Sequence, residues 1–273
     1  MINKILDFQL SEASNDAIRQ LQKTSENILL CAERMKNNKD PFEKALSILY
    51  RTSITPGAKI IITGVGKSYK IGVKLAATFS STGTVAIPMH STEALHGDLG
   101  LIRPGDCIIA ISYSGETEEL VRVIDILNSR RPRSGSFSQS VNSASDYSSS
   151  GSETCSESDF IYIPDDKITQ FSSESLYNTF DGCNDTPIIS LSGKGNSRLA
   201  MSSDVWLDVS VNSECSELVP APTISTTLTL ALGDVLSMNL MKMKGFVKQD
   251  FLHFHPGGSL GDSLKASRNN NQD

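Results

Sequence analysis

Short apolar runs alternate with amphipathic segments along most of this sequence, and this alternation constrains the fold more than any other feature. The run at 58–64, AKIIITG, is β-branched and ends in glycine, as a buried strand does. In the segment that follows, Ile71, Leu75 and Phe79 recur at four-residue steps, the spacing of one helix face. Further strands are predicted at 84–89, 106–112, 186–193 and 205–211. Strands that alternate with helices predict an α/β fold, with a mostly parallel sheet covered by helices on both faces.

Helices are predicted at both ends of this alternation and between its strands. The first forty residues carry apolar side chains at helical spacing. A second helix is expected to begin at Asp40 and Pro41, because proline fits the first helical position and aspartate can cap the helix. The other predicted helices cover 67–81, 116–127, 196–203 and a long segment from about Thr223 to Met243.

Composition and charge exclude several classes of protein. The formal net charge is −6, which gives no electrostatic reason for binding nucleic acid or an anionic membrane. No apolar run approaches the roughly 18 residues of a membrane span, and charged residues interrupt the N-terminal segment where a signal peptide needs an apolar core. The five cysteines are never spaced as C-x-x-C, which is typical of free thiols in a reducing compartment. We therefore expect a cytoplasmic protein.

A serine-rich segment at about 131–186 interrupts the alternation. It has few large apolar residues, so it cannot bury enough surface to offset the entropy of ordering it, and we expect it to be disordered. It is either a passive linker or a regulatory segment, because serines beside basic or acidic residues, such as Ser134 and Ser156, are suited to phosphorylation. The strand pattern resumes afterwards, which predicts one domain with an insert.

The first predicted strand ends in Gly-Val-Gly-Lys-Ser, which resembles half of a nucleotide-binding loop. A P-loop needs a glycine five positions before Gly66, where this chain has Ile61, and a dinucleotide fingerprint needs a third glycine where it has Tyr69. What remains is a glycine turn that opens onto a helix N-terminus, with Lys67 and Ser68 at its mouth. Such a terminus suits one phosphate group or sugar hydroxyls, although alone the turn could be a plain strand-to-helix connection.

A second strand ends in a hydroxyl-rich turn at 112–117, SYSGET. The hydroxyls of Ser112, Ser114 and Thr117, with the N–H groups around Gly115, could surround a phosphate with neutral donors, or could only cap a helix. Ligands of open α/β sheets bind outside the carboxyl ends of strands, where both turns are expected. Two such turns together favour a phosphate-binding site.

These two turns, followed in order by EALHGDLG (93–100), APTISTT (221–227) and FHPGGSLG (254–261), resemble the sugar isomerase (SIS) domain and, more narrowly, the D-arabinose-5-phosphate isomerase family. The resemblance implies a three-layer α-β-α sandwich around a mostly parallel five-stranded sheet, assembled as a homotetramer with active sites near subunit contacts. It implies a single SIS domain over 1–264, interrupted by the serine-rich insert, and a polar tail at 265–273. Bacterial members commonly continue into a pair of cystathionine-β-synthase-type domains, which are not expected in this chain.

The resemblance also implies an aldose–ketose isomerase that interconverts D-arabinose 5-phosphate and D-ribulose 5-phosphate through an enediol, with no cofactor and no metal. Such an enzyme opens the cyclic sugar, moves a proton between C1 and C2 and stabilises charge on the carbonyl oxygen. It needs a base of near-neutral pKa, an electrophile and a phosphate anchor remote from the reacting atoms. The partners expected are a small-molecule sugar phosphate and other copies of the chain.

By position in these motifs, the family's catalytic residues fall on Lys67, Glu116, Glu214 and His255. His255 is assigned to ring opening or proton transfer, and Lys67 to the oxyanion or the phosphate. Glu214 is a candidate base whose pKa should be raised by burial near the substrate, and Glu217 is close enough in sequence to compete for that role. Glu116 is either a second acid or base or a charge at a helix N-terminus.

The remaining candidates are expected to contact the substrate. His96 would bind sugar hydroxyls or help to assemble a neighbouring site, and Ser225 and Thr226 would line the sugar pocket, although hydroxyls there also commonly cap a helix. The residues expected to contact the sugar or its phosphate are Gly66, Ser68, His96, Ser112, Ser114, Gly115, Thr117, Ser225 and Thr226. No metal site follows from spacing, because His253 and His255 are two residues apart and point in opposite directions in an extended chain.

Two other functions remain open. An isomerase of another sugar phosphate, such as a hexose phosphate, would share the phosphate anchor, and the sequence does not separate it from the first. A non-catalytic phosphosugar-binding regulator would need the phosphate turns but not the acid–base residues. The presence together of Lys67, Glu116, Glu214 and His255 disfavours the regulator.

Overall fold

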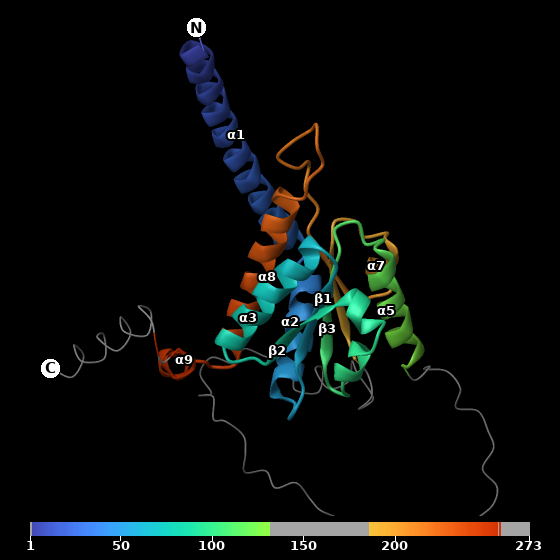
Figure 1. The fold of residues 1–273 in the computed structure, drawn as a ribbon. Helices are drawn as coiled ribbons and strands as arrows, with labels where there is room; N and C mark the ends of the chain where they lie inside the picture. Colours follow the sequence, from blue (N-terminus) through green and yellow to red (C-terminus); the bar gives the residue numbers. More distant parts are fainter. Residues whose placement is uncertain (1, 132–185, 256, 258–273) are drawn as a thin grey trace, which may run out of the picture. The chain divides into compact units, whose positions relative to one another are not determined.

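Five parallel strands form a single sheet in the order β2-β1-β3-β4-β5, with helices on both faces (Figure 1). The computed structural model describes residues 2–131, 186–255 and 257. The strands are β1 (Ile60–Gly64), β2 (Ala86–His90), β3 (Cys107–Ile111), β4 (Ile188–Ser192) and β5 (Val205–Asp208). The predicted α/β fold around a five-stranded parallel sheet is confirmed.

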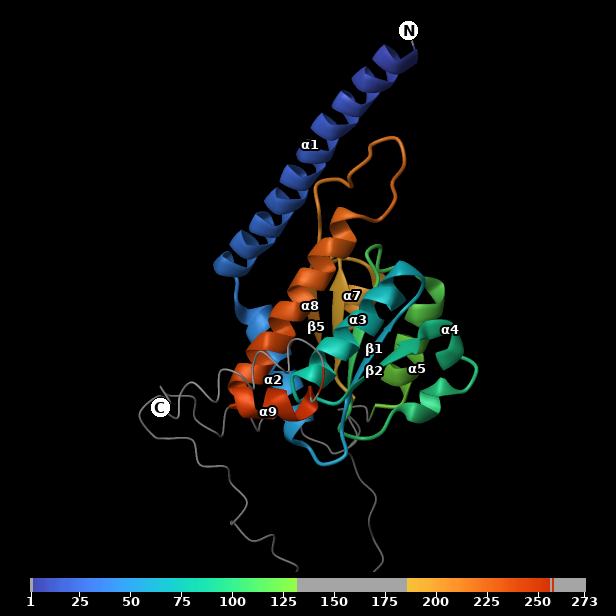
Figure 2. The same cartoon turned by 60° about the vertical axis from the view of Figure 1, so that its left-hand side comes forward.

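Different helices cover the two faces of the sheet (Figure 2). One face carries α2 (Asp40–Ile54), α3 (Lys67–Ser81) and α8 (Ile224–Met243), and α8 also packs against α1 (Ile2–Asn37). The other face carries α4 (Ser91–Ala94), the 3-10 helix η1 (Asp98–Leu101), α5 (Glu118–Ser129) and α7 (Arg198–Met201). The last helix, α9 (Lys248–Phe254), follows α8 in the chain. The arrangement is the expected three-layer sandwich.

Alternate side chains of the central strands enter two separate apolar layers. Ile61 and Ile108 belong to one cluster with Ile124 of α5, whereas Ile62 contacts Gly72 of α3 on the opposite face. β1, β3 and β4 are buried along their whole length, while the edge strands β2 and β5 are partly exposed. Continuous apolar runs are what a parallel sheet covered on both faces requires.

Most predicted element bounds agree with the structure to within three residues. The predicted cap of α2 was wrong: Asp40 is the first helical residue, and the N-cap is Lys39, whose side chain makes no capping hydrogen bond. Asp40 instead adds negative charge to the first helical turn, where the helix dipole favours it. The short elements α4, η1 and α9 were not predicted, although α7, which is as short as α4, was.

The serine-rich insert predicted at 131–186 lies outside the described residues, apart from its two ends, as do Ser134, Ser156 and the predicted tail at 265–273. At the ends, Arg131 donates from Nη2 to the carbonyl oxygen of Thr186 at 2.6 Å and forms an ion pair with Asp204. The two end residues of the insert are therefore in contact, and the elements before and after it belong to one compact unit.

Within the described part of the chain, α8 is the one helix that is long and apolar enough to cross a membrane by length and composition. Half of that stretch is buried inside the protein. Gly233 of α8 leaves room for the side chain of Leu75 on α3, since a Cβ at Gly233 would lie 2.4 Å from a Leu75 methyl carbon. The apolar character of α8 thus serves packing against the neighbouring helices.

Candidate functional site

The strand order reverses at β1, which pairs with β2 on one side and with β3 on the other. Such a reversal opens a crevice outside the carboxyl ends of the two strands, which is where open α/β sheets bind ligands. The register sets Gly64 opposite Ile111, so the turns that follow β1 and β3 leave the sheet at the same level. A Cβ on Gly64 would lie 3.0 Å from the carbonyl oxygen of Ile111, so only glycine allows this close approach. The two predicted turns are neighbours.

The first turn, 65–68, leads directly into α3. Gly66 is the N-cap residue and has a φ of +59°, a conformation that favours glycine. No side chain caps α3, and the main-chain N–H groups of Lys67 and Ser68 have no acceptor among the described residues. The side chain of Lys67 is exposed at the same end of the helix. These free donors at a helix N-terminus are suited to an anion.

The second turn, 112–117, has hydroxyl groups that are bonded to one another. Ser112 Oγ lies 2.9 Å from Thr117 Oγ1 and 3.4 Å from Ser114 Oγ, and it accepts the N–H of Gly115 at 3.1 Å. The N–H of Glu116 donates to Ser114 Oγ at 3.2 Å. The turn therefore holds three hydroxyls in a fixed cluster before any ligand is present.

A third loop, 193–198 after β4, lies against the second turn and was not predicted as part of the site. The N–H of Gly193 donates to the carbonyl of Tyr113 at 2.9 Å, and a Cβ on Gly115 would approach Ser197 Oγ to 2.1 Å. The two loops therefore fit together only because residue 115 is glycine. The sequence contained a signal for this loop, because Ser-Gly-Lys-Gly-Asn-Ser follows a predicted strand and repeats the strand–glycine–lysine order of the first turn.

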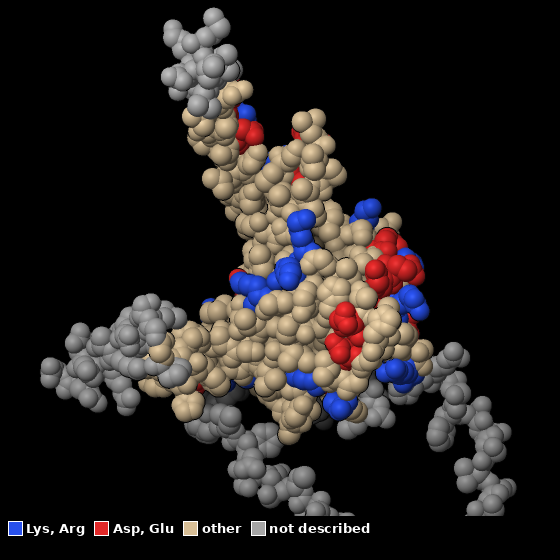
Figure 3. All heavy atoms as spheres, in the orientation of Figure 1, with Lys and Arg blue, Asp and Glu red and all other residues tan. Residues whose placement is uncertain are grey.

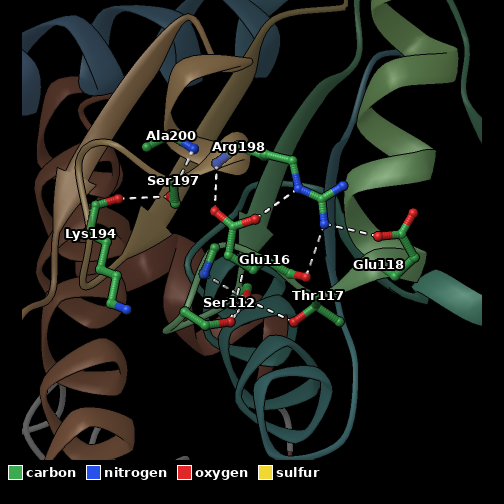
Figure 4. Close-up of polar contacts among 10 residues, drawn as sticks. Ser112, Glu116, Thr117, Glu118, Lys194, Ser197, Arg198 and Ala200 are labelled. Atoms are coloured by element: carbon green, nitrogen blue, oxygen red, sulfur yellow. Dashed lines mark hydrogen bonds and ion pairs between the residues drawn. The ribbon is translucent and has the colours of Figure 1, made fainter.

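Glu116 projects from the second turn toward the third loop (Figure 4). Its carboxylate accepts the main-chain N–H of Arg198 at 2.9 Å and Arg198 Nε at 2.8 Å, and the same guanidinium donates to Glu118 at 2.9 Å. The hydrogen bonds from Arg198 hold the pKa of Glu116 below its ordinary value, and the charge of Lys194 acts in the same direction. Glu116 is thus an ionised, exposed carboxylate beside the hydroxyl cluster.

The surface around the two turns differs in charge (Figure 3). Basic side chains gather over α3, whose exposed lysines are Lys67, Lys70 and Lys74. Over α5 and α7, acidic and basic side chains lie together, as the contacts of Arg198 with Glu116 and Glu118 require. The first turn therefore adjoins net positive charge, whereas the charges beside the second turn are largely paired.

Glu214 lies in the loop that joins β5 to α8, and its carboxylate binds the N-terminus of α8. Oε2 accepts the N–H groups of Thr223 at 2.8 Å, Ile224 at 2.7 Å and Ser225 at 3.3 Å and the hydroxyl of Thr223 at 2.9 Å, and Oε1 accepts the hydroxyl of Ser225. Burial raises the pKa of Glu214, but the hydrogen bonds from Ser225 and Thr223 outweigh it and hold the pKa below its ordinary value. The expected upward shift was wrong, because the burial comes with donors that favour the ionised form.

The loop that carries Glu214 also contacts the second turn. Tyr113 Oη lies 3.4 Å from both the carbonyl oxygen and the main-chain nitrogen of Val211. Ser225 is buried, and Thr226 donates its hydroxyl to the carbonyl of Thr223 at 2.7 Å. In this structure both hydroxyls serve the start of α8, the alternative that the sequence left open, and their contact with sugar stays a prediction.

His255 lies away from Lys67. It follows α9, where its ring stacks on that of Phe251 with centroids 3.9 Å apart. Phe254 of α9 stacks on Phe246, whose ring occupies the space beside Gly83, just past the end of α3. Lys67 begins α3, so the length of this fifteen-residue helix, about 22 Å, separates Lys67 from the attachment of α9.

His96 is exposed in the segment between α4 and η1. Its main-chain N–H donates to the carbonyl of Glu93 at 2.9 Å, and this fixes the backbone while the ring stays accessible. The position is compatible with a contact either to sugar or to a neighbouring copy. Across the described ranges, no three histidine, cysteine, aspartate or glutamate side chains are grouped so that they could hold a metal ion.

Part of this chain matches a known domain family, and most of it is similar to curated proteins. The SIS domain model matches residues 53–149, a range that includes the first two turns. Arabinose 5-phosphate isomerase KdsD of Francisella tularensis subsp. tularensis is 32% identical over 260 residues, which are 95% of this chain and 62% of the relative. KdsD of Shigella flexneri is 35% identical over 206 residues, which are 76% of this chain and 46% of the relative. The chain thus spans about half to three-fifths of the length of these curated relatives.

Among solved structures, c3406 of Escherichia coli CFT073 in complex with arabinose 5-phosphate has a similar fold. It superposes with a TM-score of 0.61 at 28% sequence identity, over 89% of this chain and 98% of that one. This similarity agrees with the α/β fold and its parallel sheet.

Proposed function

We propose, from the premise that the chain is a SIS-domain protein similar to the arabinose 5-phosphate isomerases, that it interconverts D-arabinose 5-phosphate and D-ribulose 5-phosphate through an enediol. The observation that carries the proposal is the pair of donor-rich turns at the carboxyl ends of β1 and β3, with Glu116 beside them. The clustered hydroxyls of the second turn are suited to bind the phosphoryl group, and the free N–H groups of the first turn are suited to stabilise negative charge on the carbonyl oxygen. Relatives named for this activity and a similar fold in complex with arabinose 5-phosphate support the same substrate class.

The ionisation of the two glutamates divides the acid and base roles. The pKa values of Glu116 and Glu214 are both held below the ordinary value, so both side chains are carboxylates at neutral pH. A carboxylate accepts the proton that moves between C1 and C2, and the acid that opens the sugar ring must be another group. His255 takes that role in the proposal, and Lys67 stabilises charge on the carbonyl oxygen or the phosphate.

Because His255 is remote from Lys67 within one chain, we propose that another copy supplies it, in a homotetramer with active sites near subunit contacts. Exposed apolar side chains offer surfaces for such contacts, among them Leu21 and Leu29 on α1 and Leu218 in the loop before α8. Mixing a Lys67→Met variant with a His255→Ala variant tests this. Activity in the mixture above that of either parent supports a shared site, and no gain contradicts it.

The wider organisation belongs to the same proposal. One SIS domain covers 1–264 and carries the serine-rich insert at 131–186, and a polar tail follows at 265–273. The contact between Arg131 and Thr186 supports this, because it joins the chain on both sides of the insert. The protein would act in the cytoplasm without a cofactor.

Turnover of a panel of sugar phosphates tests the reaction. Purified protein is incubated with D-ribulose 5-phosphate, D-arabinose 5-phosphate and several hexose phosphates, and aldose–ketose conversion is followed. The proposal expects kcat/KM to be highest for the pentose pair. Preference for a hexose phosphate would contradict the proposed reaction and indicate an isomerase of another sugar phosphate. Binding without conversion across the panel would favour a phosphosugar-binding regulator, which needs the turns but not the carboxylates.

A further inference from the structure

The two oxygens of the Glu214 carboxylate have unequal surroundings. Oε2 accepts four hydrogen bonds, three from main-chain N–H groups at the start of α8 and one from the hydroxyl of Thr223. Oε1 accepts one hydrogen bond within the described residues, from the hydroxyl of Ser225. Each carboxylate oxygen has two lone pairs, so Oε2 is saturated while Oε1 keeps capacity for one more proton.

We infer that Ser225 is a positioning residue for Glu214, whose hydroxyl orients the carboxylate so that Oε1 is the oxygen left to accept a proton from the substrate. The inference rests on the proposed function, since it takes Glu214 as the base. It also gives Ser225 a different role from the sugar contact expected from sequence, because its side chain is only 1% exposed.

Both ends of this hydrogen bond are fixed by further hydrogen bonds. The carbonyl of Ser225 accepts the hydroxyl of Thr229 at 2.8 Å, one turn further along α8. On the other side, Lys23 of α1 donates from Nζ to the carbonyl of Glu214 at 3.1 Å, and the N–H of Cys215 donates to Thr223 Oγ1 at 3.0 Å. A donor and an acceptor that are both fixed in this way can set an orientation, rather than only follow it.

The charged groups near Glu214 do not orient its carboxylate in place of Ser225. Lys23 contacts the main chain of Glu214, not its carboxylate. Glu217 lies in the same loop, and α8 carries no ionisable side chain before Asp234. No ion pair to the Glu214 carboxylate is found within the described residues. Hydroxyl and N–H donors therefore hold the carboxylate.

Removal of the Ser225 hydroxyl should affect turnover in two opposite ways, through the basicity of Glu214 and through its orientation. The pKa of Glu214 rises, because the ionised form loses a donor, and a carboxylate of higher pKa is a stronger base. If basicity alone mattered, turnover well above this pKa would stay equal or increase. If orientation matters, as we infer, turnover falls even where Glu214 is fully ionised.

The test compares four variants of the full chain. In Ser225→Ala we expect kcat to fall about 10- to 100-fold, with a smaller change in KM, and the acidic limb of kcat/KM to move to higher pH. Ser225→Thr keeps the hydroxyl and should restore kcat. Thr223→Ala removes a donor from Oε2, so it should move the acidic limb in the same direction but lower kcat less. Ser237→Ala is the control, since Ser237 is equally buried on α8 and bonds Thr82 far from the site.

An unchanged kcat in Ser225→Ala, or an equal loss in Thr223→Ala, overturns the inference. If the alanine variant does not fold, Ser225→Cys keeps the volume with a weak donor and is judged by the same criteria. Titration of the Glu214 carboxyl carbon by ¹³C NMR, assigned with Glu214→Gln, separates this inference from the proposed function. If the protein turns over no sugar phosphate, a pKa of Glu214 that rises in Ser225→Ala still supports the Ser225 contact, and an unmoved pKa overturns it.

Discussion

The turns that follow β1 and β3 are neighbours and each contains a glycine of positive φ, but they are built differently. Around Gly66 of the first turn, an added Cβ would meet nothing within 4 Å, and the helix N-terminus behind it has free donors. Gly115 of the second turn packs directly on Ser197, and the hydroxyls of Ser112 and Thr117 are bonded to each other. The first turn is open and adjoins basic side chains, while the second is closed and its one charged side chain, Glu116, is paired with Arg198.

This difference separates two ways of binding an anion. A closed turn has its donors in place before the ligand arrives, so little ordering entropy is lost on binding. An open turn keeps free donors and an exposed cation, Lys67, which can respond to charge that develops during a reaction. The second turn is therefore the better anchor for a phosphate, and the first is the better partner for an oxyanion.

The largest expected effect of this difference between the two turns is on folding stability. Gly115→Ala should lower the free energy of unfolding by about 3 kcal/mol, because it adds strain at φ +66° to a collision with Ser197. Gly66→Ala should cost about 1 kcal/mol, since it meets strain at φ +59° but open space. Urea unfolding followed by circular dichroism measures both. Equal losses would mean that the third loop moves aside at no cost and that the second turn is not closed.

How much could be predicted from sequence depends on whether a feature is set within one segment or by contact between segments. The strands β1, β3 and β4 were located because a strand buried on both faces allows only apolar residues. The first two turns were found because a strand end and a helix start are both visible locally. The bond between Glu116 and Arg198 was not, since these residues are 82 positions apart and meet only through the pairing of β3 with β4.

Glu214 shows a second limit of prediction. Its burial could be expected, but the direction of its pKa shift depends on how the loop folds back onto the first N–H groups of α8. The remote position of His255 likewise follows from the contact of Phe246 with Gly83, which no local pattern indicates. Structure set within one segment was predictable, whereas contacts between distant segments were not.

A smaller effect is expected from the ion pair that closes the second turn. Arg198→Gln should raise the pKa of Glu116, because the guanidinium bonds are lost while the main-chain N–H of residue 198 remains. A carboxylate with a lowered pKa loses its ionised form only as pH falls through that pKa. The acidic limb of the pH–activity profile should therefore move to higher pH.

The profile of kcat/KM against pH measures this shift, with Arg122→Gln as the control, since Arg122 is an exposed arginine on α5. Stability should change little at any pH, because the pair is solvent-exposed. If the acidic limb of the kcat/KM profile does not move in Arg198→Gln, Glu116 does not need to be ionised for activity. The second turn would then serve only as a phosphate anchor.

The smallest expected effect concerns the phosphate itself. Inorganic phosphate at a concentration equal to its Kd should stabilise the folded protein by about 0.4 kcal/mol, measured by thermal unfolding against chloride at equal ionic strength. Ser112→Ala should weaken this stabilisation more than Ser68→Ala, because Ser112 Oγ organises Ser114, Gly115 and Thr117, whereas Ser68 lies on the open turn. A larger loss in Ser68→Ala would reverse the comparison, since free donors would then bind the phosphate better than hydroxyls already bonded to one another.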